Sequence, residues 1–233
     1  MKASSILAAA LVAALNGGIM ATARAQVPPT ALEAKSYRDL HDAAWRGDAR
    51  RIGELVAGGA ALEARDGHGR TPLHVATFAR HLDAVRALAR GGAKLGALED
   101  DRYDAVTIAA VANDETTLAL LLELGASARQ ITSRYDGTAL IAAAHLGHVG
   151  VVRQLIAAGA PLDHVNNLHW TALIESIVLG DGGPRHLATL KSLVDAGANV
   201  CLRDRDGTLP LEMARKRSYS EMAHILEKDS ARC

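Results

Sequence analysis

The chain has 233 residues, of which 49% are hydrophobic and only 3% are aromatic, and its formal net charge is zero. A neutral chain without long charge runs does not favour a nucleic-acid partner. Its two cysteines, Cys201 and Cys233, are too few for a disulfide framework or, by themselves, for a zinc site.

The first 25 residues are predicted to be a secretory signal peptide. A short basic start, Met1-Lys2, precedes an apolar run, and Ala23-Arg24-Ala25 has the pattern of a cleavage site. The run from Ile6 to Leu15 is short for a bilayer span, so an uncleaved anchor is the lesser alternative. We expect cleavage after Ala25, a periplasmic or secreted protein without membrane insertion, and a disordered lead-in over residues 26–35.

After the lead-in, one dipeptide recurs at the end of apolar segments. The Gly-Ala pairs recur at an almost constant spacing, longer only before the last pair, and begin at Gly59, Gly92, Gly125, Gly159 and Gly197. A fixed period of about 33 residues is typical of stacked-repeat proteins. The glycine of each pair can adopt the left-handed conformation that ends a helix.

The most complete copy reads Thr71-Pro-Leu-His74, then Asp83-Ala-Val-Arg-Ala-Leu88 and Gly91-Gly-Ala93. In these residues the chain resembles the ankyrin-repeat family. Thr71 would cap a first helix, and Pro72 would take its first position, where a missing N–H has no cost. The resemblance implies an all-α solenoid of about six helix-turn-helix repeats with hairpin tips, because each unit must stack on neighbours to bury its apolar face.

We place the repeat domain at residues 36–229, with a tail at 230–233. The repeats are expected at about 36–65, 66–99, 100–130, 133–165, 166–202 and 204–227. Repeat five has an excess of five residues over repeat two, located between its helices at Leu179–Arg185. Such insertions are often functional, but a neutral loop lengthening costs little free energy, so both interpretations stay open.

The ten histidines invite a metal or catalytic interpretation, but the repeat pattern accounts for four of them. His41 and His74 hold the Thr-Pro-Leu-His position, and His81 and His148 lie between paired helices, where the family's histidines hydrogen-bond locally and hold loops. His-Glu-x-x-His and Gly-x-Ser-x-Gly patterns are absent from the sequence. We expect no enzymatic activity, no cofactor and no bound metal. The alternative is a metal-binding or hydrolytic enzyme that uses His145, Asp163, His164 and His169.

The pairing of the cysteines stays open. In an oxidising compartment Cys201 and Cys233 could be joined, because the C-terminal tail can fold back over repeat six. Two free thiols are the alternative, and nothing in the local sequence requires the bond.

The resemblance also implies a binding surface, because in this family the two positions after the Ala-Ala of each first helix line a concave groove beside the hairpin tips. Exposed apolar groups on such a surface are typical of protein-binding sites, and Tyr, Trp and Arg are enriched at hot spots. The groove candidates are Trp45, Arg46, Phe78, His145, Leu146, Val178 and Leu179, and the tip candidates are Arg70, Tyr103, Tyr135 and Trp170. The alternative is structural, with Trp45 simply covering the first repeat.

We therefore expect a monomeric, non-catalytic scaffold that binds another protein, one located in the periplasm. The chain looks like the periplasmic ankyrin proteins of proteobacteria, some of which accompany a catalase and support peroxide resistance. That resemblance implies support of an exported enzyme or of oxidative-stress defence. The alternative binding function is that of an immunity or inhibitor protein against an exported toxin or lipase.

Overall fold

The computed structural model describes residues 26–230 and Cys233, so the predicted signal peptide lies outside the described residues. Within the described part the chain forms thirteen helices, and its single β-like feature is an isolated bridge between Thr132 and Gly137. None of these helices combines the length and the apolar composition that crossing a bilayer requires.

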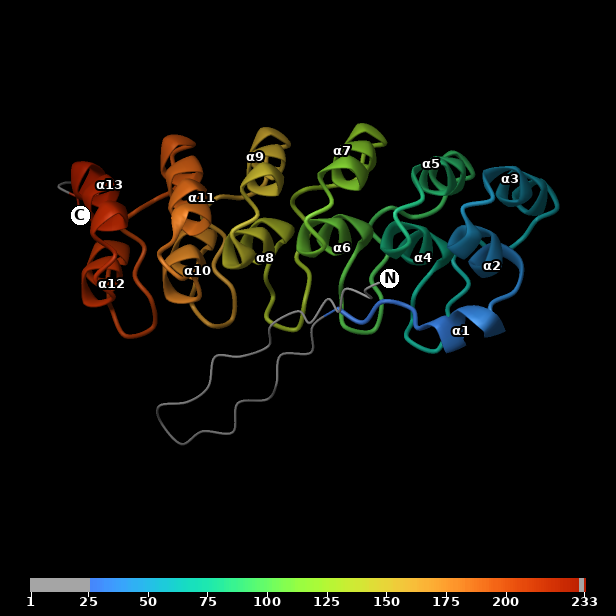
Figure 1. Cartoon of the computed structure of the whole chain (residues 1–233), viewed down its shortest axis with the longest axis horizontal. Coiled ribbons are helices and arrows are strands. Elements are labelled where there is room, and N and C mark those ends of the chain that lie inside the picture. Colours follow the sequence, from blue (N-terminus) through green and yellow to red (C-terminus); the bar gives the residue numbers. More distant parts are fainter. Residues whose placement is uncertain (1–25, 231–232) are drawn as a thin grey trace, which may run out of the picture.

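Twelve helices form six pairs that stack side by side in two rows (Figure 1). The inner row contains α2 (Asp39–Arg46), α4 (Pro72–Phe78), α6 (Ala105–Val111), α8 (Ala139–Leu146), α10 (Ala172–Val178) and α12 (Pro210–Lys216). The outer row contains α3 (Ala49–Ala57), α5 (Leu82–Arg90), α7 (Glu115–Glu123), α9 (Val149–Ala157), α11 (Pro184–Asp195) and α13 (Ser220–Ser230). The prediction of an all-α solenoid of six helix-turn-helix repeats is confirmed. We call the inner row and the tips that project below it the inner-helix surface.

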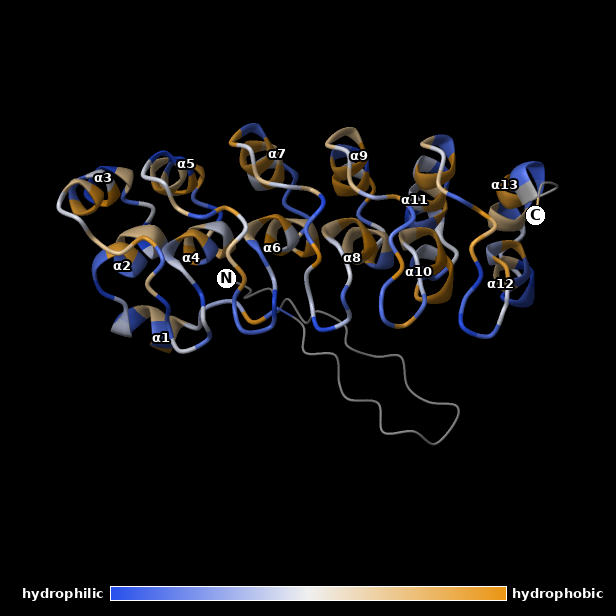
Figure 2. Ribbon diagram, turned by 180° about the vertical axis from the view of Figure 1, so that it is seen from behind, coloured by the Kyte–Doolittle hydropathy of each residue, from blue (hydrophilic) through white to orange (hydrophobic). Residues whose placement is uncertain are grey.

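The core runs between the two rows along the whole stack. Each outer helix buries at least one large aliphatic residue completely, and these residues include Ile52, Leu88, Leu121, Leu155, Leu193 and Leu226. Small residues of the inner helices, such as Ala44, Ala110 and Ala144, are also fully buried and let the helices approach closely. The loops below the inner row contain hydrophilic stretches alongside neutral and apolar ones (Figure 2). Because the helices pack on their own repeat and its neighbours, the stability of the fold is a sum of neighbour contacts.

The Gly-Ala pairs end the outer helices as predicted. At Gly59 the backbone φ is 83°, in the left-handed region that glycine adopts without strain. The Gly59 N–H donates to the Val56 carbonyl and the Ala60 N–H to the Leu55 carbonyl, both at 3.0 Å, which satisfies carbonyls at the end of α3. The glycines of the other four pairs have φ between 78° and 96°.

The lead-in predicted to be disordered over residues 26–35 is helical in its second half. Helix α1 (Ala31–Ser36) begins with a capping box. The Glu33 N–H donates to Thr30 Oγ1 at 3.2 Å, and the Thr30 N–H donates to Glu33 Oε2 at 2.7 Å. The spacing of Thr30 and Glu33 is a known sequence signal for a helix start, so the segment could have been recognised as ordered.

The excess residues of repeat five lengthen a helix as well as a loop. Helix α11 has 12 residues, whereas α9 has 9, and residues 179–183 connect it to α10. His186 Nδ1 lies 2.8 Å from Asp181 Oδ1, and the Tyr219 hydroxyl donates to the Gly180 carbonyl at 3.0 Å. These contacts hold the insertion against repeats five and six.

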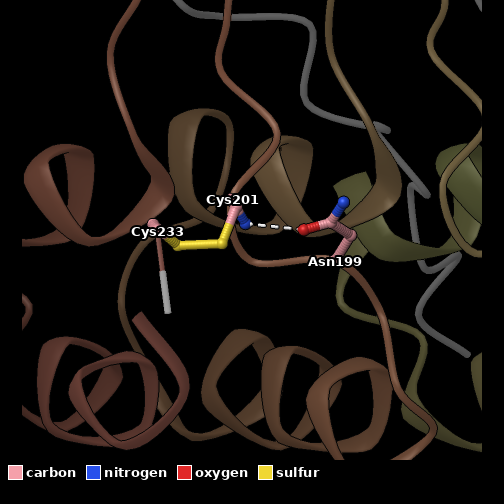
Figure 3. The surroundings of a disulfide bond; sticks show 3 residues. All are labelled: Asn199, Cys201 and Cys233. Carbon is pink, nitrogen blue, oxygen red and sulfur yellow. Dashed lines mark hydrogen bonds between the residues drawn. A yellow bond between two sulfur atoms is a disulfide. The ribbon is translucent and has the colours of Figure 1, made fainter. Parts of the chain in front are cut away.

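Cys201 and Cys233 are joined in a disulfide (Figure 3). Their Cα atoms are 5.3 Å apart, and the Cys201 N–H donates to Asn199 Oδ1 at 2.9 Å. The bond connects the end of the chain beyond α13 to the turn that follows α11. It therefore fixes repeat six, which has a neighbouring repeat on one side only.

Candidate protein-binding surface

The predicted groove residues lie at the C-terminal ends of the inner helices, where equivalent positions of stacked repeats are neighbours. Arg46 and His145 are the exposed members of this set, with 70% and 47% of their side chains accessible. The apolar members are half-buried, namely Trp45, Phe78, Leu146, Val178 and Leu179. Trp45 also packs against the core, so it covers the first repeat as the structural alternative proposed, while the residue as a whole stays partly exposed.

Three of the predicted tip residues are aromatic and accessible, fully or in part, and these are Tyr103, Tyr135 and Trp170. Neighbouring tips are joined by ion pairs. Arg102 Nη1 lies 3.0 Å from Asp136 Oδ1, and Arg134 Nη2 lies 2.6 Å from Asp101 Oδ1. Exposed pairs of this kind contribute about 1 kcal/mol or less each, so their main effect is to orient the tips relative to one another.

The prediction that Arg70 is an exposed tip residue is wrong, because its side chain is only 1% exposed. Its guanidinium donates to Asp66 Oδ2 at 2.7 Å, to Glu33 Oε1 at 2.8 Å and to the Val27 carbonyl at 3.0 Å. Hydrogen bonds from Thr30 and from Arg70 lower the pKa of Glu33 to about 2. The ordered N-terminal segment thus covers Arg70 and uses it as an anchor.

Three of the four repeat histidines bridge neighbouring repeats. His41 Nε2 lies 2.9 Å from the Arg70 carbonyl, and His81 Nε2 lies 3.1 Å from the Trp45 carbonyl. His148 Nδ1 lies 3.0 Å from the Ala110 carbonyl. The expectation that these histidines hold loops is confirmed, but the bonds run between repeats rather than only locally.

His74 combines a local bond with a bond to the next hairpin. Its Nδ1 accepts the Thr71 N–H at 3.0 Å, so the proton of the neutral ring is on Nε2, which donates to the Ala97 carbonyl at 2.9 Å. Burial lowers the pKa of His74 to about 4. The imidazole therefore stays neutral at physiological pH and acts as a structural connector.

The structure does not assemble the alternative metal-binding or hydrolytic site. His164 Nε2 lies 2.6 Å from the Asp136 carbonyl, and the Asp163 carboxylate accepts the Asn199 N–H at 2.8 Å. His169 Nδ1 lies 3.3 Å from Arg205 Nη2 at a hairpin tip. Among the described residues, no group of three histidine, cysteine or acidic side chains is placed to hold a metal ion.

One carboxyl beside His145 was not among the predicted residues. Glu175 of α10 is 5% exposed, and its Oε1 accepts a hydrogen bond from Asn166 Nδ2 at 2.8 Å. Burial raises the pKa of Glu175 to about 8, although the Asn166 bond opposes this rise. A single acidic residue inside the apolar run Ala172–Val178 is the sequence signal that could have identified it.

A hollow of about 840 Å³ lies between the segment that precedes α2, the end of α3 and the hairpin of residues 64–68, and none of the predicted groove residues lines it. It is bordered by Tyr37, His41, Leu55 and Arg65. The His41 ring and the Tyr37 ring lie 5.3 Å apart on its wall. Both side chains already bind the hairpin of residues 66–70, so we assign the hollow no separate role.

The fold is that of a helical-repeat protein built from stacked helix pairs. The family model for ankyrin repeats, which describes three copies, matches residues 40–132 and 109–204, so the chain belongs to the ankyrin-repeat family. The putative ankyrin repeat protein YahD of Escherichia coli K12 is 31% identical over 185 residues, covering 79% of this chain and 92% of YahD.

Solved structures have the same fold. An ankyrin repeat domain from Acinetobacter baumannii AYE is 41% identical with a TM-score of 0.75, covering 80% of this chain and 95% of that one. A chain from a complex of a predatory endopeptidase with an immunity protein, from Bdellovibrio bacteriovorus, has a TM-score of 0.67. It is 24% identical and covers 82% of this chain and 98% of its own, a likeness that shows the fold alone. Ankyrin repeats mediate protein–protein binding, and none of these matches indicates an enzyme family.

Proposed function

We propose that this protein is an exported, non-catalytic ankyrin-repeat scaffold that binds another protein through its inner-helix surface. The observation that carries the proposal is the row of half-buried apolar side chains at the ends of α2, α4, α8 and α10, with the exposed Arg46 and His145 beside them and aromatic tips nearby. Such a mixture is typical of surfaces that bury an apolar centre and keep a polar rim. We propose that it acts as a monomer.

The disulfide supports export. Disulfides persist in oxidising compartments such as the periplasm and are rare in cytosolic proteins. The full sequence can be expressed in a bacterial host that is then fractionated, and the N-terminal residue of the product read by mass spectrometry. A periplasmic form that begins at Gln26 is expected. A cytosolic form that retains Met1 and free thiols would contradict export.

Within this proposal, the partner is an exported enzyme, and enzymes of oxidative-stress defence belong to the proposed class. The support is the resemblance to periplasmic ankyrin proteins alone, since nothing in the sequence points to peroxide chemistry. The inhibitor alternative is not proposed, because the likeness to the chain from the immunity-protein complex shows the fold alone.

The binding test uses residues that can be changed without opening the core. The Arg46→Ala/Tyr135→Ala variant removes two exposed side chains from the inner-helix surface, and Arg90→Ala/Lys228→Ala removes two exposed side chains from the outer row. Wild type and both variants are used as baits in periplasmic extract of the bacterium that carries the gene. A partner that the outer-row variant retains and the inner-surface variant loses supports the proposal. Equal capture by all three baits would move the binding site elsewhere, and capture of no partner by wild type would contradict the function.

A further inference from the structure

One position of the inner helices carries an unusual residue in repeat five. Four residues after the helix cap, α4, α6, α8 and α12 have the apolar residues Val75, Ile108, Ala142 and Met213. At the same position α10 has Glu175, which is 5% exposed. An ionisable side chain at a buried position destabilises the fold unless it is paired, so its presence needs a reason other than packing.

Repeat one shows how a carboxylate at this position is neutralised. Asp42 of α2 occupies the equivalent place, and Arg46, four residues later on the same helix, lies 2.8 Å from it. In repeat five the residue four positions after Glu175 is Leu179, the C-cap of α10. Repeat five therefore has the carboxyl group of this arrangement without its cation.

Among the described residues, one oxygen of the Glu175 carboxyl has no hydrogen-bond partner. Oε1 accepts from Asn166 Nδ2 at 2.8 Å, whereas Oε2 lies 3.6 Å from His145 Nδ1, beyond hydrogen-bond distance. Among the described residues, His145 is the sole basic side chain within 4.0 Å of this carboxyl. The equivalent residue of the preceding repeat, Ala142, is small and half-buried, while Val75 at the same position of repeat two is fully buried. On the Oε2 side the carboxyl therefore faces the His145 ring, whose side chain is 47% exposed.

His145 does not supply the missing charge. Partial burial, together with the neighbouring His186 and His148, lowers the pKa of the His145 imidazole. The other acidic group nearby, Asp181, is engaged with His186 at 2.8 Å. Without a cation the Glu175 carboxyl is held largely protonated at neutral pH, since burial raises its pKa to about 8.

We propose that Glu175, His145 and Asn166 form a binding site for a lysine or arginine side chain of the partner protein. This inference rests on the proposed function and names the chemistry of one contact. The incoming cation takes the role that Arg46 has in repeat one, and Glu175 gives up its proton to solvent as the cation arrives. Asn166 holds the carboxylate in place, and the exposed face of the His145 ring packs against the stem or the guanidinium plane. A charge pair desolvated within an interface is typical of a binding anchor.

The first test titrates the site with small probes. The carboxyl ¹³C resonance of Glu175 is followed against pH in the purified protein, alone and with N-acetyl-arginine amide or its neutral isostere N-acetyl-citrulline amide. We expect the arginine compound to lower the pKa of Glu175 by about one unit and the citrulline compound to leave it unchanged. Equal effects of the two compounds, or no effect of either, would overturn the site.

The variant Glu175→Gln tests the role of the charge. Its amide oxygen can still accept from Asn166, so the fold is retained, and a thermal melt checks this. We expect at least about tenfold weaker binding of the arginine compound, measured from the shifts of the His145 ring resonances. Glu221→Gln, on the exposed side of α13, is the matched control and should bind as wild type does. Undiminished binding by Glu175→Gln would overturn the proposal.

Capture experiments separate this inference from the proposed function. A partner that binds wild type and Glu175→Gln with equal affinity, but not Arg46→Ala/Tyr135→Ala, would refute the cation site and leave the inner-helix surface intact. Loss of the partner with both variants supports both. If all variants capture the same proteins, the inner-helix surface is not the interface, and the cation site as a partner contact fails with it.

Discussion

Replacing both cysteines, as Cys201→Ser/Cys233→Ser, removes the covalent closure of repeat six. The two residues are 32 positions apart, so the bond closes a loop of about 33 residues in the unfolded chain. In the chain-entropy model such a loop stabilises the folded state by about 3.7 kcal/mol at room temperature. Repeat six packs against α10 and α11 on one side only, so the loss should appear there first.

The assay is urea unfolding followed by circular dichroism, combined with hydrogen exchange read by mass spectrometry. We expect the free energy of unfolding to fall by up to about 3–4 kcal/mol and amide protection to drop in α12 and α13 while α6 and α7 keep theirs. Wild type treated with a reductant should behave like the double variant, and the double variant should not respond to reductant. A change below about 0.5 kcal/mol, which is the size of an ordinary surface substitution, would refute the reasoning. An equal loss of protection in all repeats would refute it too.

Three further predictions concern buried ionisable groups. Arg70→Met leaves Asp66 and Glu33 without their cation and should cost about 3–5 kcal/mol in urea unfolding, with faster proteolysis before residue 36. The control Arg90→Met, at an exposed side chain of α5, should change little. The pKa of His74 is lowered to about 4, so the unfolded state takes up a proton first as pH falls. The free energy of unfolding should therefore decrease by up to about 3 kcal/mol between about pH 6.5 and 4. The variant His74→Gln should lack this pH dependence. The pKa of Glu175 is raised to about 8, so the stability of the folded protein should decrease as pH rises from about 4.5 to 8. The variant Glu175→Gln should therefore have a higher melting temperature than wild type at pH 8 but not at pH 4. A lower melting temperature of the variant at pH 8 would contradict the assigned burial cost.

Sequence reasoning reached the fold because the signals of a repeat protein are local and recur. Gly59 and its four equivalents end the first five outer helices by their own backbone conformation, and Thr71 with Pro72 starts a helix within one turn. Each repeat contacts only its neighbours, so local rules that hold once hold along the whole stack. Residues at equivalent positions could therefore be assigned to one surface before any coordinates.

The tertiary structure alone decided which of those residues are available. The sequence predicts Arg70 as an exposed tip residue. In the structure a segment from much earlier in the chain places Glu33 and Val27 against it. In the sequence Glu175 is one acidic residue in a predicted helix. Only the structure places Asn166 and His145 beside its carboxyl. Whether Cys201 and Cys233 pair depended on where α13 directs the end of the chain. The period and the helix ends follow from short-range conformational preferences, which the sequence carries directly, whereas burial, ion pairing and disulfide geometry depend on groups that only the folded chain brings together.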